Sequence, residues 1–351
     1  MADTVRYLLE EMIPELEDLE KRGLFSKGEI REVVKKRTNF EYLLKRRATL
    51  KADYLRYVEF ESKFEVLRRH RKRSLNLTDE KASISDHSVS RRIHFIYERA
   101  TRKFKGDLRL WLRYFEFCRA SGSTKSLSKI ISRALQMHPT AAGLWSYAAA
   151  YEFESLHNPD AARALMQRGL RMCKGSERLW LEYFRMELLY AHKLETRRKI
   201  LDLTMDTIGA GGAGTDDTPA STASAAVRSG AVACVVVSKA AEGIQGKPAF
   251  LARFLDILEM FEGAFPAVKA RVVQEIMSRF PRDPASRARV AAAAGDESLA
   301  LAIEAFEAAV GDVPSAEMFE LYARYLRERV DSILSPGSEG GTEGKGSEGG
   351  E

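Results

Sequence analysis

Three tryptophan-led stretches decide the fold of this 351-residue chain: WLRYFEFC at 111–118, WSYAAAYE at 145–152 and WLEYFRME at 180–187. Their first residues are the three tryptophans of the sequence, and they lie 34 and 35 residues apart. Self-similarity at a period of roughly 20–50 residues indicates a solenoid, in which each unit buries its apolar face by stacking on its neighbours. We therefore expect an array of helical repeats, an architecture that usually serves as an interaction surface.

A second series of residues keeps step with the tryptophans. Arg99, Arg133 and Arg168 stand in the similar strings IYERATR, ISRALQM and MQRGLRM, and they are again 34 and 35 residues apart. Turn residues between the two series predict helix–turn–helix units over 91–208. A small residue follows each arginine, at the point where helices would approach closely: Ala100, Ala134 and Gly169.

The signature residues of one repeat lie on the same face of a helix and suit the contact with a neighbouring helix. In Trp180-x-x-Tyr183-x-x-x-Glu187 the side chains fall at i, i+3 and i+7, on one face of a helix. The rings suit the gap between paired helices better than base stacking, and the glutamate needs a cation, for which an arginine of a packed second helix is the candidate. Tyr54 takes the tryptophan slot 57 residues before Trp111. The expected repeat-core signature is Tyr54, Tyr57, Glu61, Trp111, Tyr114, Trp145, Glu152, Trp180, Tyr183 and Glu187.

Composition and periodicity divide the chain into six segments. We expect an opening helix that ends near Gly23, and a helix whose buried face includes AVACVVV at 231–237. The segments are an N-terminal helical region with a first repeat-like unit at 1–73, an exposed connection at 74–90, core repeats at 91–208, a flexible Gly/Ala/Ser/Thr linker at 209–230, degenerate helical repeats at 231–333 and a disordered tail at 334–351.

Charge is unevenly distributed along the sequence. Residues 1–208 carry 42 Lys and Arg against 29 Asp and Glu, whereas residues 209–351 carry 14 against 21. The stretch 91–133 is the most polarised, with 12 basic and 3 acidic residues. A basic half suits a nucleic-acid or acidic-protein partner, or simply a solvated helical surface. Three scattered cysteines, no signal-peptide core and no apolar run of membrane length predict an intracellular, soluble protein without membrane contact.

The candidate functional residues are basic rather than catalytic. The clusters KKR at 35–37 and RRHRKR at 68–73 suit phosphate contact or nuclear import, and the alternative is a solvated helix end. GAGGAG at 209–214 lacks the Lys-Ser/Thr of a nucleotide loop, and the six histidines lack metal-ligand spacing. We therefore predict no enzyme, no cofactor and no metal. The residues expected to bind RNA or direct nuclear import are Lys35, Lys36, Arg37, Arg68, Arg69, Arg71, Lys72 and Arg73.

The Trp-x-x-Tyr-x-x-x-Glu slot and the Arg-Ala pair resemble the half-a-tetratricopeptide (HAT) repeat. Plain tetratricopeptide repeats also recur about every 34 residues, but they place Trp-x-x-Leu-Gly-x-x-Tyr in the first helix, and no slot here has that glycine. The resemblance implies an all-α fold, a right-handed superhelical solenoid of antiparallel helix pairs. It also implies a role beside RNA, because HAT repeats occur mainly in RNA-processing assemblies.

The N-terminal strings IPELEDLEKRGLFSKGEI (13–30), VVKKRTNFEYLLKRR (33–47) and DYLRYVEFE (53–61) resemble one HAT family, that of the U3 small nucleolar RNA-associated protein 6. The resemblance implies a non-catalytic scaffold of the small-subunit processome in the nucleus and nucleolus, which supports U3-dependent pre-rRNA processing and 18S rRNA maturation. The implied partners are processome proteins, WD-repeat subunits among them, and U3 snoRNA or pre-rRNA, bound directly or indirectly. Two alternatives stay open: a scaffold of a splicing or mRNA 3′-end complex, and an adaptor without RNA contact.

Overall fold

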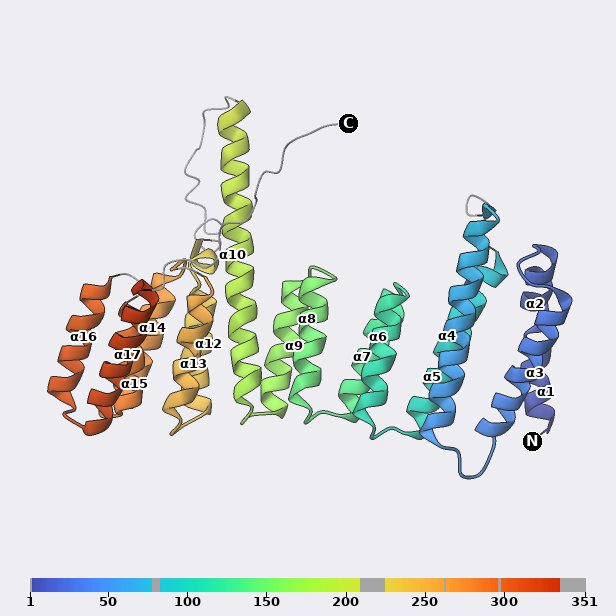
Figure 1. The fold of residues 1–351 in the computed structure, drawn as a ribbon, viewed down its shortest axis with the longest axis horizontal. Helices are drawn as coiled ribbons and strands as arrows, with labels where there is room; N and C mark the ends of the chain where they lie inside the picture. Colours follow the sequence, from blue (N-terminus) through green and yellow to red (C-terminus); the bar gives the residue numbers. More distant parts are fainter. Residues whose placement is uncertain (1, 78–82, 209–224, 262, 296–297, 335–351) are drawn as a thin grey trace, which may run out of the picture. The chain divides into compact units, whose positions relative to one another are not determined.

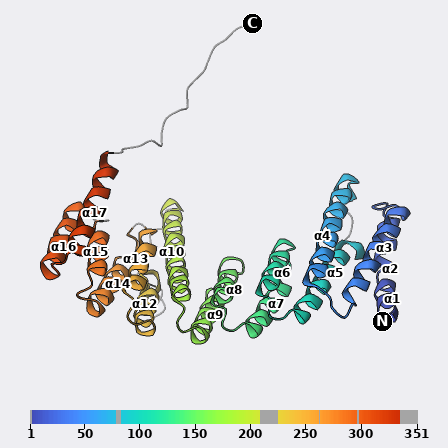
Figure 2. The same cartoon turned by 60° about the horizontal axis from the view of Figure 1, so that its bottom comes forward.

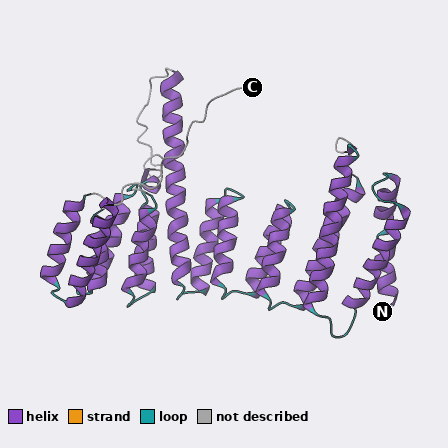
Figure 3. Ribbon diagram, in the orientation of Figure 1, coloured by secondary structure: helices purple, strands orange, loops and turns teal. Residues whose placement is uncertain are grey.

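The computed structural model describes residues 2–77, 83–208, 225–261, 263–295 and 298–334 (Figure 1). Within these ranges the regular elements are all α-helices and no strand occurs (Figure 3). The chain divides into two compact units, Met1–His138 and Pro139–Glu351. The all-α repeat fold is therefore confirmed, with a division inside the range expected to be one continuous core.

The first unit is a series of helices in which chain neighbours pack on one another. Helix α2 packs on α3 and α5, and the contacts then run α3–α4, α4–α5, α5–α6 and α6–α7 (Figure 2). Such stacking of short-range contacts is the hallmark of repeat proteins. The helices are α1(Ala2–Glu10), α2(Ile13–Lys21), α3(Lys27–Leu44), α4(Lys51–Ser74), α5(Ile84–Lys103), α6(Leu108–Ala120) and α7(Thr124–Met137).

The expected opening helix is two helices. The chain breaks between α1 and α2 because Pro14, in the first turn of α2, cannot donate the backbone hydrogen bond that a continuous helix needs. Helix α3 then begins at a reciprocal cap, in which the Ser26 hydroxyl accepts from the Glu29 N–H and the Glu29 carboxylate accepts from the Ser26 N–H. The expectation of a single helix was wrong at this point.

The expected exposed connection at 74–90 is much shorter. Helix α4 runs to Ser74 and α5 already begins at Ile84. Asp86 accepts from the Ser83 N–H at 3.0 Å and caps α5, while Ser85 and Ser88 are buried in the packed helices. The 57-residue spacing from Tyr54 to Trp111 therefore arises largely from two long helices, α4 with 24 residues and α5 with 20, and less from a loop.

The second unit continues the helix–turn–helix pattern. The expected turns all occur at boundaries between helices: Gly106-Asp107, Ser121-Gly122-Ser123, His138-Pro139, Asn158-Pro159 and Gly175-Ser176. The stretch 231–237 lies in a helix whose Val236 and Val237 are buried. No helix in the described part of the chain is long and apolar enough to cross a membrane. The helices are α8(Ala142–Glu154), α9(Pro159–Met172), α10(Glu177–Ile208), α12(Ala231–Gly243), α13(Pro248–Glu259), α14(Pro266–Arg279), α15(Pro284–Ala294), α16(Leu299–Asp312) and α17(Ala316–Leu334).

Helix α10 departs from the expected pattern. It is one helix of 32 residues, and α12 packs on it as the second helix of its pair. The segment 209–230 therefore falls inside a repeat and not between two groups of repeats. Of this expected linker, 209–224 lies outside the described residues, while 225–228 forms a helical turn and Gly230, at φ 86°, leads into α12. The expected disordered tail lies outside the described residues from 335 onward.

Stacked aromatic rings fix neighbouring helices of the first unit at a repeated spacing. Phe40 stacks on Tyr57 with 4.9 Å between ring centroids, and Tyr97 stacks on Tyr114 at 4.7 Å. Both pairs join residues 17 apart in sequence, and both tyrosines occupy the tyrosine position of the repeat signature. The same register thus recurs at the α3–α4 and α5–α6 contacts, which positions the residues discussed next.

Candidate functional site

The signature aromatic residues lie in the packed core. Trp111, Tyr57 and Tyr114 are buried, with exposed fractions of 2% or less. The indole N–H of Trp111 donates to the Lys105 carbonyl, and that of Trp145 donates to the Pro139 carbonyl, in each case six residues earlier. These rings close the turn before their own helix, so that they are not available to stack on bases.

Trp180 differs from the other two tryptophans. Its side chain is only half-buried, and its indole nitrogen has no hydrogen-bond partner among the described residues. The ring lies beside Gly243 at the end of α12. A cavity of about 770 Å³, formed by α9, α10 and α12, is lined by this indole together with Tyr183 and the exposed Val235.

Two signature glutamates are held by arginines of the preceding helix. Arg37 of α3 donates two hydrogen bonds to Glu61 of α4, at 2.7 and 2.8 Å. Arg163 of α9 donates two to Glu187 of α10, at the same two distances. Both pairs join residues 24 apart. The glutamate therefore clamps its helix to the helix before it through a two-bond, charge-assisted contact.

In the remaining two repeats, the positions of the arginine and the glutamate are not occupied by such an ion pair. At the α5–α6 contact, His94 and Cys118 occupy the two positions, 3.9 Å apart, and His94 also reaches the Tyr114 hydroxyl at 3.2 Å. Burial raises the pKa of the Cys118 thiol to about 12 and lowers the pKa of His94, so both groups are neutral at pH 7. This pair holds helices together and is not an activated thiolate.

Glu152 has no such partner. The residue 24 positions before it is Ser128, not an arginine, and no ion pair or side-chain hydrogen bond to the Glu152 carboxylate occurs among the described residues. Burial raises the pKa of Glu152 above its ordinary value. The charged carboxylate of Glu152 therefore destabilises the folded protein at neutral pH.

The structure corrects part of the expected RNA-binding set. Arg37 is 1% exposed in its pair with Glu61. Arg68 is 3% exposed and donates to Glu65 at 2.8 Å and to Asp86 at 2.7 Å. Neither guanidinium can reach a phosphate, because both are enclosed by carboxylates that the chain itself supplies.

Three further members of that set are committed to internal ion pairs. Arg71 donates two hydrogen bonds to Glu29, and this contact lowers the pKa of Glu29 to about 2. Lys72 donates to Asp86 and Arg69 to Glu65, both at 2.7 Å. The cluster at 68–73 therefore fastens α4 to α3 and α5. Among the expected residues the exposed ones without an ion pair in the described structure are Lys35, Lys36 and Arg73.

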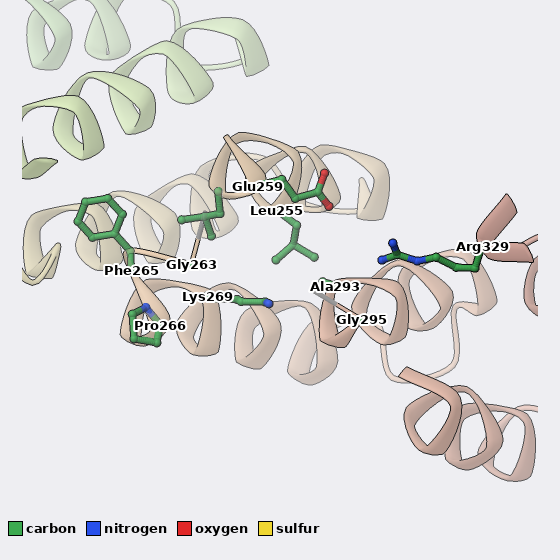
Figure 4. Close-up of a pocket in the computed structure, with 10 residues that line it drawn as sticks. Leu255, Glu259, Gly263, Phe265, Pro266, Lys269, Ala293, Gly295 and Arg329 are labelled. Atoms are coloured by element: carbon green, nitrogen blue, oxygen red, sulfur yellow. The ribbon is translucent and has the colours of Figure 1, made fainter. Parts of the chain in front are cut away.

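The second unit also contains a cavity that the sequence did not predict. It has a volume of about 470 Å³ and lies among α13, α14, α15 and α17 (Figure 4). Glu259, Lys269 and Arg329 line it beside Leu255 and Phe265. Glu259 is already held by Arg289 at 2.5 Å. Among the described residues that line it, no nucleophile lies beside a general base.

The fold and its Arg–Glu pairs define the class: an α-helical protein built from packed, repeated helix pairs. Within this class, residues 9–92 match the family model described as U3 small nucleolar RNA-associated protein 6. The resemblance to that family is confirmed by the match and by the relatives that follow.

Relatives with the same description come from distant organisms. The chain is 42% identical over 201 residues to U3 small nucleolar RNA-associated protein 6 of Schizosaccharomyces pombe. It is 38% identical over 199 residues to the Mus musculus homolog and 36% identical over 199 residues to the Homo sapiens homolog. Each match takes in 57% of this chain. The chain spans less than half the length of these relatives, since the matches cover 41% of the first and 33% of each of the others.

Among solved structures, the crystal structure of YrrB, a TPR protein with an unusual peptide-binding site, aligns with 67% of this chain and 97% of its own. The sequence identity is 12% and the TM-score 0.26. This sequence identity and TM-score are too low to show a shared fold. The helix pairs of the present chain are seen in its own structure.

Proposed function

We propose that this chain is a non-catalytic scaffold that acts with U3 small nucleolar RNA in the small-subunit processome, where it supports pre-rRNA processing and 18S rRNA maturation. The observation that carries the proposal is the similarity to U3-associated proteins at 36–42% identity over about 200 residues, together with the family match at 9–92. The proposed location is the nucleolus, and the proposed partners include WD-repeat processome proteins.

The packing of the helices supports a scaffolding role, because it leaves their outward faces free to bind partners. The signature residues are used to join helices, as in the Arg37–Glu61 and Arg163–Glu187 pairs, and the stacked helices present their outward faces to partners. Within each unit, packed helices of this kind can bind partners on their outer faces without any reacting group. We accordingly propose that the repeats before residue 208 carry the shared function.

Affinity purification of the tagged full-length chain from nuclear extract tests this proposal. The expected result is enrichment of U3 snoRNA over spliceosomal small nuclear RNAs, with WD-repeat proteins in the eluate. Enrichment of spliceosomal RNAs would favour the splicing alternative instead. An eluate with protein partners but no RNA would favour the general adaptor.

A further inference from the structure

A polar groove lies between the second helices of two neighbouring repeats in the first unit. Helices α5 and α7 form its walls and Tyr114 of α6 lies at its base; the three helices are labelled in Figures 1 and 2. Its volume is about 460 Å³. Arg91 and His94 line it from α5, and Ser126 and Lys129 line it from α7.

The groove offers cations and hydroxyls together. Arg91 and Lys129 are exposed, come from different helices and make no ion pair in the described part of the chain. Ser90 and Ser126 also line the groove, and no hydrogen bond engages either hydroxyl among the described residues. Positive charge from two sides, with free hydroxyl donors between, suits the oxygens of a phosphate group.

Beside these residues and the exposed His87, the other polar side chains of the groove are already engaged. His94 lies 3.2 Å from the Tyr114 hydroxyl and 3.3 Å from the Ser123 hydroxyl, and its lowered pKa, caused by burial, keeps the ring neutral at pH 7. Glu98, the acidic residue at the groove, lies 3.8 Å from the Arg102 guanidinium. The positive character of the groove therefore rests on Arg91 and Lys129.

The stretch of chain that forms most of the groove, 91–133, is basic, and most of its cations have no ion-pair partner in the described structure. The stretch 91–133 contains 12 basic residues, and of these Arg92, Arg99 and Arg102 are in ion pairs. This is the reverse of the 68–73 cluster, in which Glu29, Glu65 and Asp86 neutralise Arg68, Arg69, Arg71 and Lys72. The nine basic residues without an ion pair in the described structure are Arg91, Lys103, Lys105, Arg109, Arg113, Arg119, Lys125, Lys129 and Arg133.

We infer that the α5–α7 groove binds a backbone phosphate of an RNA strand, with Arg91 and Lys129 as the contacting cations, while the other unpaired cations of 91–133 add long-range attraction to the strand. The choice of RNA as the polyanion rests on the proposed function. The lining also favours it over an acidic peptide, because a docked helix needs apolar anchor pockets and Ile130 is the aliphatic residue that the groove provides.

The full-length chain and a 20-nucleotide uridine RNA, followed by fluorescence anisotropy across a salt series, provide the test. Arg91→Ala/Lys129→Ala should weaken binding at least about tenfold and should make the slope of log affinity against log salt shallower by about 0.7, since one phosphate contact on a single strand contributes about 0.7. The matched control is Lys27→Ala/Arg282→Ala, which removes the same charge at exposed positions outside the groove and outside the expected RNA-binding set, and should change affinity less than about threefold.

Equal losses in the two variants would overturn the inference, because they would show diffuse attraction to net charge. Failure of the wild-type chain to bind RNA, or equally effective displacement of the RNA by polyglutamate, would overturn it as well. Unchanged circular-dichroism melting curves would show that both variants fold. U3 enrichment of the tagged chain is a separate readout: it can persist when the groove fails, and the groove can bind RNA when U3 enrichment fails.

Discussion

Arg37 and Glu61 lie 24 residues apart and form a buried two-bond ion pair, and Arg163 and Glu187 repeat that pair at the same separation. The arginine comes from the helix that precedes the signature helix. The pair therefore joins one repeat to the next, and its loss should separate repeats instead of disturbing one helix alone.

Arg37→Met tests this linkage, because it leaves Glu61, which is fully buried, without its cation. We expect a loss of about 3–5 kcal/mol in the free energy of unfolding of the first unit, measured by urea denaturation. Arg37→Met/Glu61→Leu should recover much of the loss, since neither charge is then buried alone. Lys63→Ala, which removes an exposed ion pair with Glu59 on α4, serves as the control and should leave the urea midpoint unchanged. A single variant as stable as wild type would contradict the linkage.

Gly169→Ala tests the close approach of α9 to α8. An added Cβ would lie 2.8 Å from the Cβ and Cγ atoms of Trp145, so that one helix must shift. The expected destabilisation is about 1–3 kcal/mol by chemical denaturation. Gly143→Ala is the matched control on α8, because nothing lies within 4 Å of its added Cβ. It should be neutral or stabilising by up to about 1 kcal/mol. Equal effects at the two positions would show that packing against the indole does not matter.

Asp86→Asn tests the pH dependence of the α4–α5 contact. Burial alone would raise the pKa of Asp86, but hydrogen bonds from Lys72, the Ser83 N–H and Arg68 lower it from 3.8 to about 2. A carboxyl whose folded-state pKa is lowered contributes stability above its unfolded pKa and loses it as the pH falls. The wild-type melting temperature should therefore drop between pH 3.8 and about 2, and the drop should be shallower in Asp86→Asn. Asp331→Asn, at an exposed position, should reproduce the wild-type profile; a variant profile as steep as wild type would refute the role of Asp86.

Glu152→Gln should raise the melting temperature at pH 7. Burial raises the pKa of Glu152 above 4.5, so the charged form is the less stable one in the folded protein. That cost is present above the folded-state pKa and disappears as the pH falls below the unfolded value of 4.5. The gain from the substitution should therefore vanish in acid. Glu154→Gln, at an exposed position nearby, should give no gain at either pH, and a gain equal to that of Glu152→Gln would point to net charge as the cause.

Much of the architecture could be predicted from local pattern. The period of the tryptophans, the turn residues and the apolar faces predict helix pairs, because these signals reside in residues a few positions apart. The register of Phe40 on Tyr57 and of Tyr97 on Tyr114 follows from the same repeat. Even the start of α5 has a local signal in Ser83 and Asp86, a cap pattern that a polar, aperiodic surrounding sequence obscures.

The basic clusters could not be assigned in the same way. The ion pair of Arg71 with Glu29 joins residues 42 apart, and that of Arg68 with Asp86 joins residues 18 apart. Such partners are set by which helices pack together, and no local spacing encodes them. The sequence does indicate the unpaired charges of α5–α7, because 91–133 contains 12 basic and 3 acidic residues. Composition alone, however, does not separate paired from unpaired cations.

We propose a role for this chain in U3-dependent maturation of the small ribosomal subunit, and depletion of the chain in its host cell is the decisive test of that role. Northern blots should show that 18S rRNA falls and unprocessed pre-rRNA accumulates, while the large-subunit rRNA is maintained, and that re-expression of the intact chain restores 18S rRNA. Normal 18S rRNA after depletion, or accumulation of unspliced mRNA with rRNA unchanged, would contradict the claim.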